Sequence, residues 1–248
     1  MSQSQVSIPT AEGDARAFVF TPDTGAGPWP VALLFQDAFG MRPALYEMSQ
    51  RLAQAGYYVV LPDLYWRAGS YEPLVPAKVR GGDADAEAEL ARLRTSIKGD
   101  TTVRDVGSVL EWVKTQAQAK PGPVGLTGYC MGGRLALRVA GTYPDRVAAA
   151  ASFHGGGLAN DEPTSPHLLA PKITAKVLVA GAEQDKNFPP EQLDRLVEAF
   201  DEADIDYEAS IWPGVKHGWV PGDTPVHSPE GADKHWQALV PFLDGVLK

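Results

Sequence analysis

The only cysteine of the chain, Cys130, lies in a setting that is typical of a catalytic nucleophile. Residues 128–133 read Gly-Tyr-Cys-Met-Gly-Gly and stand between an apolar run, 124–127, and a segment of helical periodicity, 131–142. A G-x-C-x-G pattern between strand and helix has the form of the nucleophile elbow, in which glycines permit a strained turn that raises the side chain above the sheet edge. The positive end of the helix dipole favours a thiolate there. We therefore interpret Cys130 as a nucleophile for acyl transfer.

Two other interpretations of this segment are weaker. A lone cysteine is most often a small buried apolar residue. A glycine-rich turn between strand and helix can also bind phosphate, but no lysine follows the glycines as in a P-loop, and the spacing is not G-x-G-x-x-G. The glycines and the strand-to-helix context together favour the nucleophile.

A cysteine nucleophile needs a base and a group that orients the base, and in this topology the acid precedes the histidine in the chain. The apolar run 177–180 leads into Asp185, and the next run, 207–211, leads into His217, so both side chains are expected at the carboxyl edge of a sheet. Glu183, which lies closer to its strand, is the alternative acid. We predict Asp185 and His217 as the partners of the cysteine.

Backbone amides that would hold a developing oxyanion can come from two places in the chain. Residues 36–40 follow the apolar run 31–35, so the amides of Ala38 and of Met131, next to the nucleophile, are predicted to form the oxyanion hole. His154 begins an H-G-G-G motif, which supplies such amides in some esterases. Those motifs precede the nucleophile and this one follows it, so we place His154 in the pocket wall, with a plain turn as the alternative.

Short apolar runs alternate with longer segments of helical periodicity from residue 30 onward, which is the rhythm of βα units. The predicted strands are residues 15–20, 31–35, 57–61, 124–127, 147–153, 177–180 and 207–211. The predicted helices are residues 43–55, 84–97, 101–118, 131–142, 190–203 and 229–247. Most of these strands are apolar throughout, as parallel strands covered on both faces should be. The pattern predicts an α/β fold, a mostly parallel doubly wound sheet of about seven or eight strands flanked by helices.

Two long segments interrupt this rhythm. Residues 67–83 are rich in glycine and proline and are too long for an ordinary connection, so we expect them to pass over the sheet, where a lid would lie. Residues 155–171 contain three consecutive glycines and three prolines. Both segments leave from the carboxyl edge, where open α/β sheets bind ligands. No linker or internal repeat divides the chain, so residues 1–248 are interpreted as one domain.

Composition narrows the classes of function. With 22 Lys and Arg against 31 Asp and Glu, the net charge of -9 would repel a phosphate backbone, so nucleic acid is not an expected partner. No apolar run approaches the roughly 18 residues that cross a bilayer. The N-terminal segment also lacks the pattern of a signal peptide. We therefore expect a cytoplasmic protein without a membrane partner. Histidines and cysteines do not occur at zinc-site spacing, so no metal is expected.

Taken together, these residues resemble the dienelactone hydrolase family of α/β-hydrolases from about residue 31 to the C-terminus. The landmarks that match occur in the family's order. They are Gln-Asp-Ala-Phe-Gly at 36–40, Pro-Asp-Leu-Tyr at 62–65, Gly-Tyr-Cys-Met-Gly-Gly at 128–133, Asp185 with the Phe-Pro pair at 188–189, and His-Gly-Trp at 217–219. The resemblance implies that Cys130, Asp185 and His217 form a catalytic triad. It also implies hydrolysis of an ester or lactone through an acyl-thioester intermediate, without a cofactor.

Two departures from the family pattern concern the resting cysteine and the substrate. The family carries a glutamate where this chain has Asp37, and that glutamate holds the resting thiol. By resemblance, Asp37 is expected to be the partner of the resting thiol, with a cap on the following turn as the alternative. Dienelactone hydrolases also place an arginine four residues after the catalytic histidine to bind the substrate carboxylate, and this chain has Pro221 there.

The walls of the substrate pocket are expected to combine aromatic and basic side chains. Trp66, Tyr71 and Trp219 are suited to a less polar ester, although aromatic residues near strand ends also serve as core. Arg80 from the long segment and His154 complete the predicted pocket. An arginine in such a segment is otherwise solvated.

We expect a cofactor-free carboxylic ester or lactone hydrolase that acts on a small molecule, as a monomer or small homo-oligomer. A general thiol-dependent carboxylesterase or thioesterase without activity on dienelactone is the alternative, because the substrate-binding arginine is replaced. A second alternative is a non-catalytic ligand-binding or redox-sensing protein in which the cysteine is oxidised.

Overall fold

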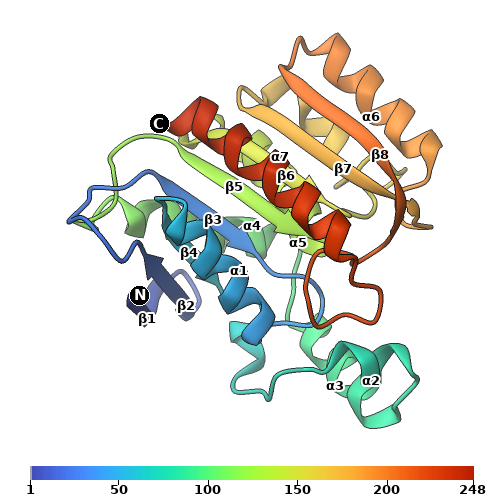
Figure 1. Ribbon diagram of the computed structural model, residues 1–248, viewed down its shortest axis with the longest axis horizontal. Helices are drawn as coiled ribbons and strands as arrows, with labels where there is room; N and C mark the ends of the chain where they lie inside the picture. Colours follow the sequence, from blue (N-terminus) through green and yellow to red (C-terminus); the bar gives the residue numbers. More distant parts are fainter. Residues whose placement is uncertain (1) are drawn as a thin grey trace.

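An eight-stranded sheet forms the centre of the molecule in the computed structural model, which describes residues 2–248 (Figure 1). The strands are β1 (Ser2–Thr10), β2 (Gly13–Thr21), β3 (Val31–Phe35), β4 (Tyr58–Pro62), β5 (Val124–Tyr129), β6 (Val147–Phe153), β7 (Lys176–Gln184) and β8 (Tyr207–Lys216). They lie in the order β1-β2-β4-β3-β5-β6-β7-β8. The strands from β4 to β8 are parallel, whereas β1 and β2 join by antiparallel pairing. The predicted mostly parallel α/β sheet is therefore confirmed.

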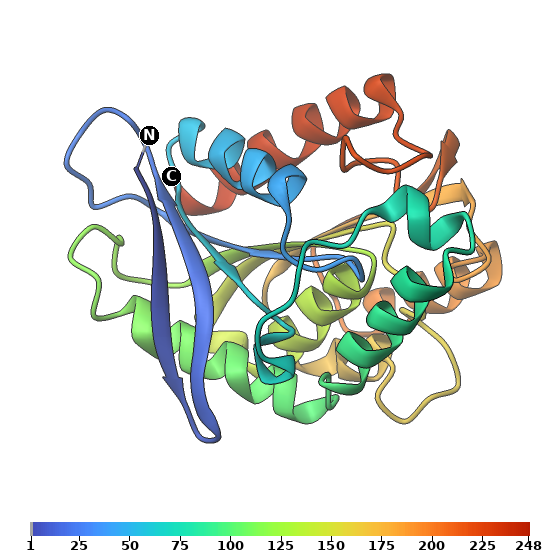
Figure 2. The ribbon, with the colours of Figure 1, turned by 90° about the horizontal axis from the view of Figure 1, so that it is seen from below.

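Helices cover both faces of this sheet, as in a doubly wound fold (Figure 2). The helices are α1 (Pro43–Gln54), α2 (Pro76–Arg80), α3 (Ala84–Thr95), α4 (Asp100–Val113), α5 (Met131–Thr142), α6 (Pro190–Glu202) and α7 (Pro229–Leu247). Short 3-10 turns occupy η1 (Trp66–Ala68), η2 (Pro144–Arg146) and η3 (Pro166–Lys172). One apolar core lies under α1 and α7, and the other lies under α4, α5 and α6. No helix in residues 2–248 is long and apolar enough to cross a membrane.

The apolar patterns account for most of these elements. All residues of β3, β4 and β5 are buried, because both faces of the central strands are covered. The apolar residues of α4 that lie between Val103 and Val113 at helical spacing are buried. That helix spans Asp100–Val113, so it ends earlier than the predicted residue 118.

The antiparallel β1 was not predicted, because its sequence lacks an apolar run. Its residues are mostly exposed, and only Ile8 is buried. The strand is stabilised by nine register pairs with β2, from Ser2–Thr21 to Thr10–Gly13. Backbone pairing at the edge of a sheet needs no strong side-chain pattern, so the amino-acid sequence carries little signal for it.

The register of the parallel strands brings the predicted catalytic loops to one edge of the sheet. Phe35 pairs with Gly128, Tyr129 with Phe153, and Phe153 in turn with Ala180. The two strands that follow extend further, to a pair between Gln184 and Lys216. The residues directly after β3, β5, β6, β7 and β8 therefore lie at the same carboxyl edge. The segment of α2 and α3 lies beyond this edge (Figure 1).

Candidate active site

Cys130 occupies a strained turn between β5 and α5. Its φ angle is 56°, in the left-handed region that L side chains rarely adopt. The flanking glycines make room for this turn. A Cβ atom at Gly128 would lie 2.0 Å from the carbonyl oxygen of Gly132, and one at Gly132 would lie 2.4 Å from that of Phe35. Larger residues are excluded at both positions, so the predicted elbow has a steric basis.

His217 lies beside both Asp185 and Cys130. Asp185 follows β7, and its Oδ1 accepts a hydrogen bond from the amide of Asn187 at 2.8 Å. Its Oδ2 lies 2.6 Å from Nδ1 of His217, which follows β8. The Asp185 side chain is completely buried, whereas 17% of the His217 side chain is exposed. Cys130 lies close enough to His217 to raise the pKa of the imidazole, and both residues line the same cavity. The three predicted residues are therefore brought together from three separate loops.

The surroundings of His217 favour its protonated form. Burial lowers the pKa of this imidazole, but the hydrogen bonds to Asp185 and Cys130 outweigh burial and raise the pKa to about 10. The imidazole therefore holds a proton at neutral pH, with a buried carboxylate on one side and a sulfur on the other. An imidazolium in this position stabilises negative charge on the sulfur.

The alternative acid, Glu183, makes a different contact. Its Oε2 accepts a hydrogen bond from the amide of Gly214 at 3.1 Å, near the end of β8. Glu183 belongs to the exposed end of β7, whereas Asp185 is buried. The geometry thus gives the position next to the imidazole to Asp185.

The two backbone amides of the predicted oxyanion hole are both available. The Met131 amide is the first of α5, where helix geometry leaves amides without an intrahelical acceptor. The Ala38 amide donates to no backbone acceptor within residues 2–248. The buried Tyr65 connects the two segments, because its hydroxyl donates to the Ala38 carbonyl at 2.9 Å and lies 3.7 Å from Sδ of Met131. Tyr65 is a support of this site that the sequence did not reveal.

The expectation for Asp37 needs correction, because its carboxylate is bound by Arg42. The two terminal nitrogens of Arg42 donate to Oδ1 and Oδ2 of Asp37 at 2.6 and 2.8 Å, and the Phe39 amide donates to Oδ1 at 3.0 Å. Arg42 also donates from Nε to Asp223 at 2.6 Å. No hydrogen bond joins Asp37 to Cys130 in the described part of the chain. The alternative of a capped turn at Asp37 fits the Phe39 bond.

A cavity of about 650 Å³ opens above Cys130 and His217. Its floor comes from the loops at the sheet edge, and its roof comes from the excursion of α2 and α3, through Val79, Arg80 and Leu90. Two of the predicted pocket residues, Arg80 and His154, line it. One terminal nitrogen of Arg80 also donates a hydrogen bond to the carbonyl oxygen of His217 at 2.9 Å.

The three aromatic residues predicted for the pocket lie elsewhere. Trp66 donates to Asp105 at 3.1 Å near α4, and the Tyr71 hydroxyl donates to Asp63 at 2.8 Å behind the oxyanion loop. Trp219 is fully buried and packs against His154 from below the cavity. These rings serve as core and as supports, which is the alternative that the sequence left open for aromatic residues near strand ends.

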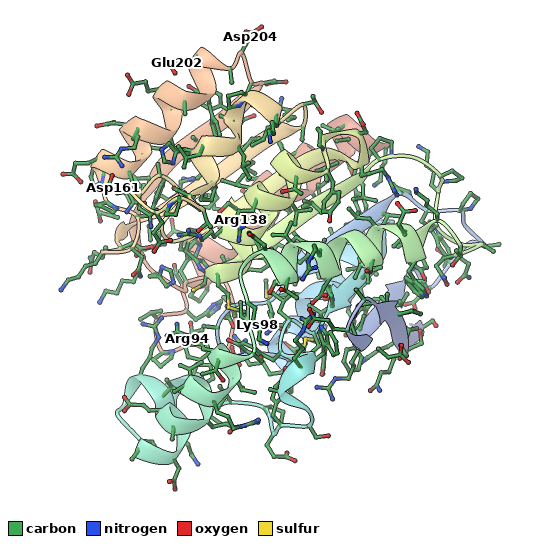
Figure 3. All side chains as sticks on the ribbon, turned by 180° about the vertical axis from the view of Figure 1, so that it is seen from behind. Arg94, Lys98, Arg138, Asp161, Glu202 and Asp204 are labelled. Atoms are coloured by element: carbon green, nitrogen blue, oxygen red, sulfur yellow. The ribbon has the colours of Figure 1, made fainter. Side chains whose placement is uncertain are left out.

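Two cations of the cavity wall, Arg94 and Lys186, were missed. Arg94 comes from α3 and lies toward the body of the molecule (Figure 3). Lys186 follows Asp185 directly. Neither forms an ion pair with a carboxylate among the residues that the structure describes. The position of Lys186 beside the predicted acid was a usable signal, whereas Arg94 is one of several arginines on a polar helix.

A metal site is not apparent in this structure. Within residues 2–248, no group of three or more His, Cys, Asp or Glu side chains is arranged to hold a metal ion.

A family model and several known proteins match most of this chain. The model of the "Dienelactone hydrolase family" matches residues 15–247. A protein of Yersinia pestis, provisionally named a carboxymethylenebutenolidase, is 26% identical over 246 residues, which cover 96% of this chain and 86% of that protein. A protein of Escherichia coli K12 with the same provisional name is 27% identical over 244 residues, covering 96% and 84%.

Solved structures show the same fold. A crystal structure from Klebsiella pneumoniae, provisionally named a dienelactone hydrolase, superposes with a TM-score of 0.82. Its sequence is 22% identical, and the alignment covers 98% of each chain. The arrangement of sheet, helices and edge loops is thus shared over nearly the whole length.

Proposed function

The chain belongs to the dienelactone hydrolase family, and from this premise we propose that it hydrolyses carboxylic esters or lactones with Cys130 as nucleophile, His217 as base and Asp185 as the group that orients the base. The observation that carries the proposal is the position of His217, which is hydrogen-bonded to Asp185 and lies beside Cys130 on the floor of an open cavity. A nucleophile, a base and an orienting carboxylate within bonding distance of one another are what acyl transfer requires.

In the first half of the reaction, the sulfur of Cys130 attacks the carbonyl carbon while His217 holds the thiol proton. The carbonyl oxygen becomes an oxyanion, for which the amides of Ala38 and Met131 are the donors, each worth on the order of 3 kcal/mol of barrier reduction. The intermediate collapses when the alcohol oxygen leaves and takes the proton from His217. This step leaves a thioester on Cys130 and a neutral imidazole.

In the second half, His217 takes a proton from a water molecule that attacks the thioester carbon. The same two amides stabilise the second oxyanion. Collapse of this intermediate breaks the carbon–sulfur bond, so the acid is released and the thiolate faces the protonated imidazole again. Asp185 keeps its hydrogen bond to Nδ1 throughout, which directs the other ring nitrogen toward the reacting atoms.

The charge of the cavity wall favours a substrate that carries a carboxylate. Arg80, Arg94 and Lys186 face the cavity, while the carboxylate of Asp37 is neutralised by Arg42. Arg134 is occupied by Glu162 at 2.6 Å. A local excess of positive charge in a chain of net charge -9 concentrates anions at the cavity. These cations fill the role of the family arginine that Pro221 replaces.

The experiment compares hydrolysis of p-nitrophenyl acetate and of cis-dienelactone before and after treatment with iodoacetamide. Turnover of both substrates that iodoacetamide abolishes is the expected result. Turnover of the simple ester alone would instead identify a general thiol esterase. Absence of any turnover, with oxidation of Cys130 by peroxide in intact mass spectra, would overturn the proposal in favour of a redox sensor.

A further inference from the structure

His154 is a buried histidine that the proposed reaction does not use. It follows β6 directly, is fully buried, and has a φ angle of 40°, one of three positive values at non-glycine residues in the described part of the chain. Its backbone amide donates to the carbonyl of Ala180 at 2.8 Å, which ties the turn to β7. A strained backbone at a buried polar residue next to a reactive group points to a constraint beyond packing.

The imidazole of His154 accepts a hydrogen bond from the nucleophile's own backbone. The amide of Cys130 lies 3.0 Å from Nδ1 of His154 and 3.1 Å from the carbonyl oxygen of Phe153. An amide can only donate, so Nδ1 must carry a lone pair and the ring proton must be on Nε2. Cys130 and His154 directly follow the neighbouring strands β5 and β6, and both have a strained backbone. One hydrogen bond thus joins these two residues.

The ring must remain neutral to accept this bond, and its surroundings keep it so. Burial lowers the pKa of His154 well below the usual value, and the positive charges of His217 and Arg80 lower it further. Protonation of Nδ1 would remove the acceptor and place a cation beside His217. The neutral ring thus holds the nucleophile without opposing the charge on the base.

The same ring also packs against the base. The ring of His154 meets His217 edge to face at 5.2 Å between centroids, and meets Trp219 at 5.0 Å. A single side chain therefore contacts the backbone of the nucleophile and the ring of its base. It is not a second base, because Nδ1 is occupied and Nε2 is protonated and has no partner within residues 2–248.

We propose that His154 is a positioning residue, whose neutral Nδ1 holds the amide of Cys130 and so fixes the sulfur and the Met131 amide relative to His217. The inference rests on the proposed function and deepens it. Without this acceptor, the strained φ angle of Cys130 has one support fewer, and relaxation of the turn moves both the sulfur and the adjacent oxyanion donor. A shift of this kind lowers kcat far more than it changes KM, because it acts on groups that meet in the transition state.

The test compares His154→Asn with His154→Gly. Asparagine and glycine both tolerate a positive φ angle, so backbone strain is matched. Asparagine carries an oxygen on Cγ, where histidine carries Nδ1, and glycine carries no acceptor. We expect His154→Gly to lower kcat for p-nitrophenyl acetate by roughly 10- to 100-fold with KM changed less than about threefold. We expect His154→Asn to recover at least about half of that loss on a logarithmic scale.

A second measurement keeps the test independent of ester turnover. The rate of alkylation of Cys130 by iodoacetamide reports the position of its sulfur near His217, even in a protein without esterase activity. We expect alkylation to be slowed in His154→Gly and largely restored in His154→Asn. If the unaltered protein hydrolysed no ester, the proposed function would be contradicted. The expected pattern of alkylation rates would still support the role of His154.

His235 provides the matched control, because it is also fully buried and neutral, with its Nε2 2.9 Å from the hydroxyl of Tyr129. His235→Asn removes a comparable ring without touching Cys130, so we expect a similar loss of thermal stability with a smaller change in kcat. Equal kcat in His154→Gly and the unaltered protein would overturn the proposal. Equal losses in His154→Asn and His154→Gly would overturn it as well, since they would assign the effect to ring packing.

Discussion

The floor and the roof of the cavity are built in opposite ways. The floor consists of turns at the ends of central strands, where Cys130 and Asp185 are fixed by glycines without room for a Cβ and by buried hydrogen bonds. The roof consists of α2 and α3, whose buried residues are only Pro76 and Leu93. Few apolar contacts mean a low free energy of local opening. In the proposed reaction, the floor supplies the reacting groups, whereas the roof supplies Arg80 and Arg94 to the cavity wall.

One small apolar cluster and a few polar contacts hold the roof down. In the cluster, the buried Leu93 of α3 packs with Tyr65 and Leu74. Arg80 donates to the carbonyl of His217, and Arg92 donates to the carbonyl of Ala68 at 2.9 Å. Glycines with positive φ angles flank the segment at Gly69 and Gly99, where an added Cβ would meet nothing within 4 Å. The first part of this region, residues 67–83, is the segment that the sequence marked as an interruption.

The largest expected effect lies at the floor. Cys130→Ala removes the nucleophile, and we expect ester turnover to fall by at least about 10⁴-fold. The thermal unfolding temperature should stay close to that of the unaltered protein, because alanine also fits the turn sterically. Steady-state assays and circular dichroism melts check both parts. Turnover in the folded variant at a tenth of the original rate would break the assignment of chemistry to this residue.

The next effect concerns the buried ion pair between Arg42 and Asp37. Arg42→Met leaves the buried carboxylate of Asp37 without its partner, so we expect the free energy of unfolding to fall by about 3–5 kcal/mol. Urea titration measures this value. Adding Asp37→Asn to the same chain should recover part of the loss, because the stranded charge is removed.

The matched control for that loss is Arg195→Met, which removes an arginine from an exposed pair with Asp161. We expect a change within about 0.5 kcal/mol there. A loss at Arg42 no larger than the loss at Arg195 would show that the floor is no more tightly built than the surface.

A smaller effect should come from the roof and should depend on the substrate. Arg94→Ala is expected to raise KM for p-nitrophenyl hemiadipate about tenfold, or about 1.4 kcal/mol, and to leave KM for p-nitrophenyl hexanoate within about twofold. The two esters differ in a terminal carboxylate. Lys78→Ala, on the exposed side of α2, is the control and should affect neither ester. An equal rise for both esters would mean that Arg94 shapes the cavity rather than binding charge.

The last effect is the pH dependence of stability at the base. The folded-state pKa of His217 is raised to about 10 from an ordinary value of 6.5, so its stabilising contribution is complete below about pH 6.5 and is lost as pH rises toward 10. The difference in unfolding temperature between the unaltered protein and His217→Gln should therefore shrink from pH 6 to pH 10. A difference that grows over this range would contradict the ion-pair environment of the imidazole.

Local patterns predicted the floor better than the roof. The glycines around Cys130 and the strand ends before Asp185 and His217 are short-range features, and a parallel sheet brings such ends to one edge. The sequence did not predict the role of Arg42. One of its two partners, Asp223, lies 181 residues further along the chain, so no local pattern indicates that pair. The pocket residues were predicted poorly, since a ring near a strand end can face either the cavity or the core.

The amino-acid sequence by itself determined the class of fold, the elbow at Cys130 and the identity of the residues that meet there, because strand and helix periodicity and the small size of glycine act over a few residues. The tertiary structure decided which groups contact one another. Only packing shows that Asp37 is bound by Arg42 and that His154 accepts the amide of Cys130. Such pairings depend on distances between distant segments, and burial gives each of them its strength.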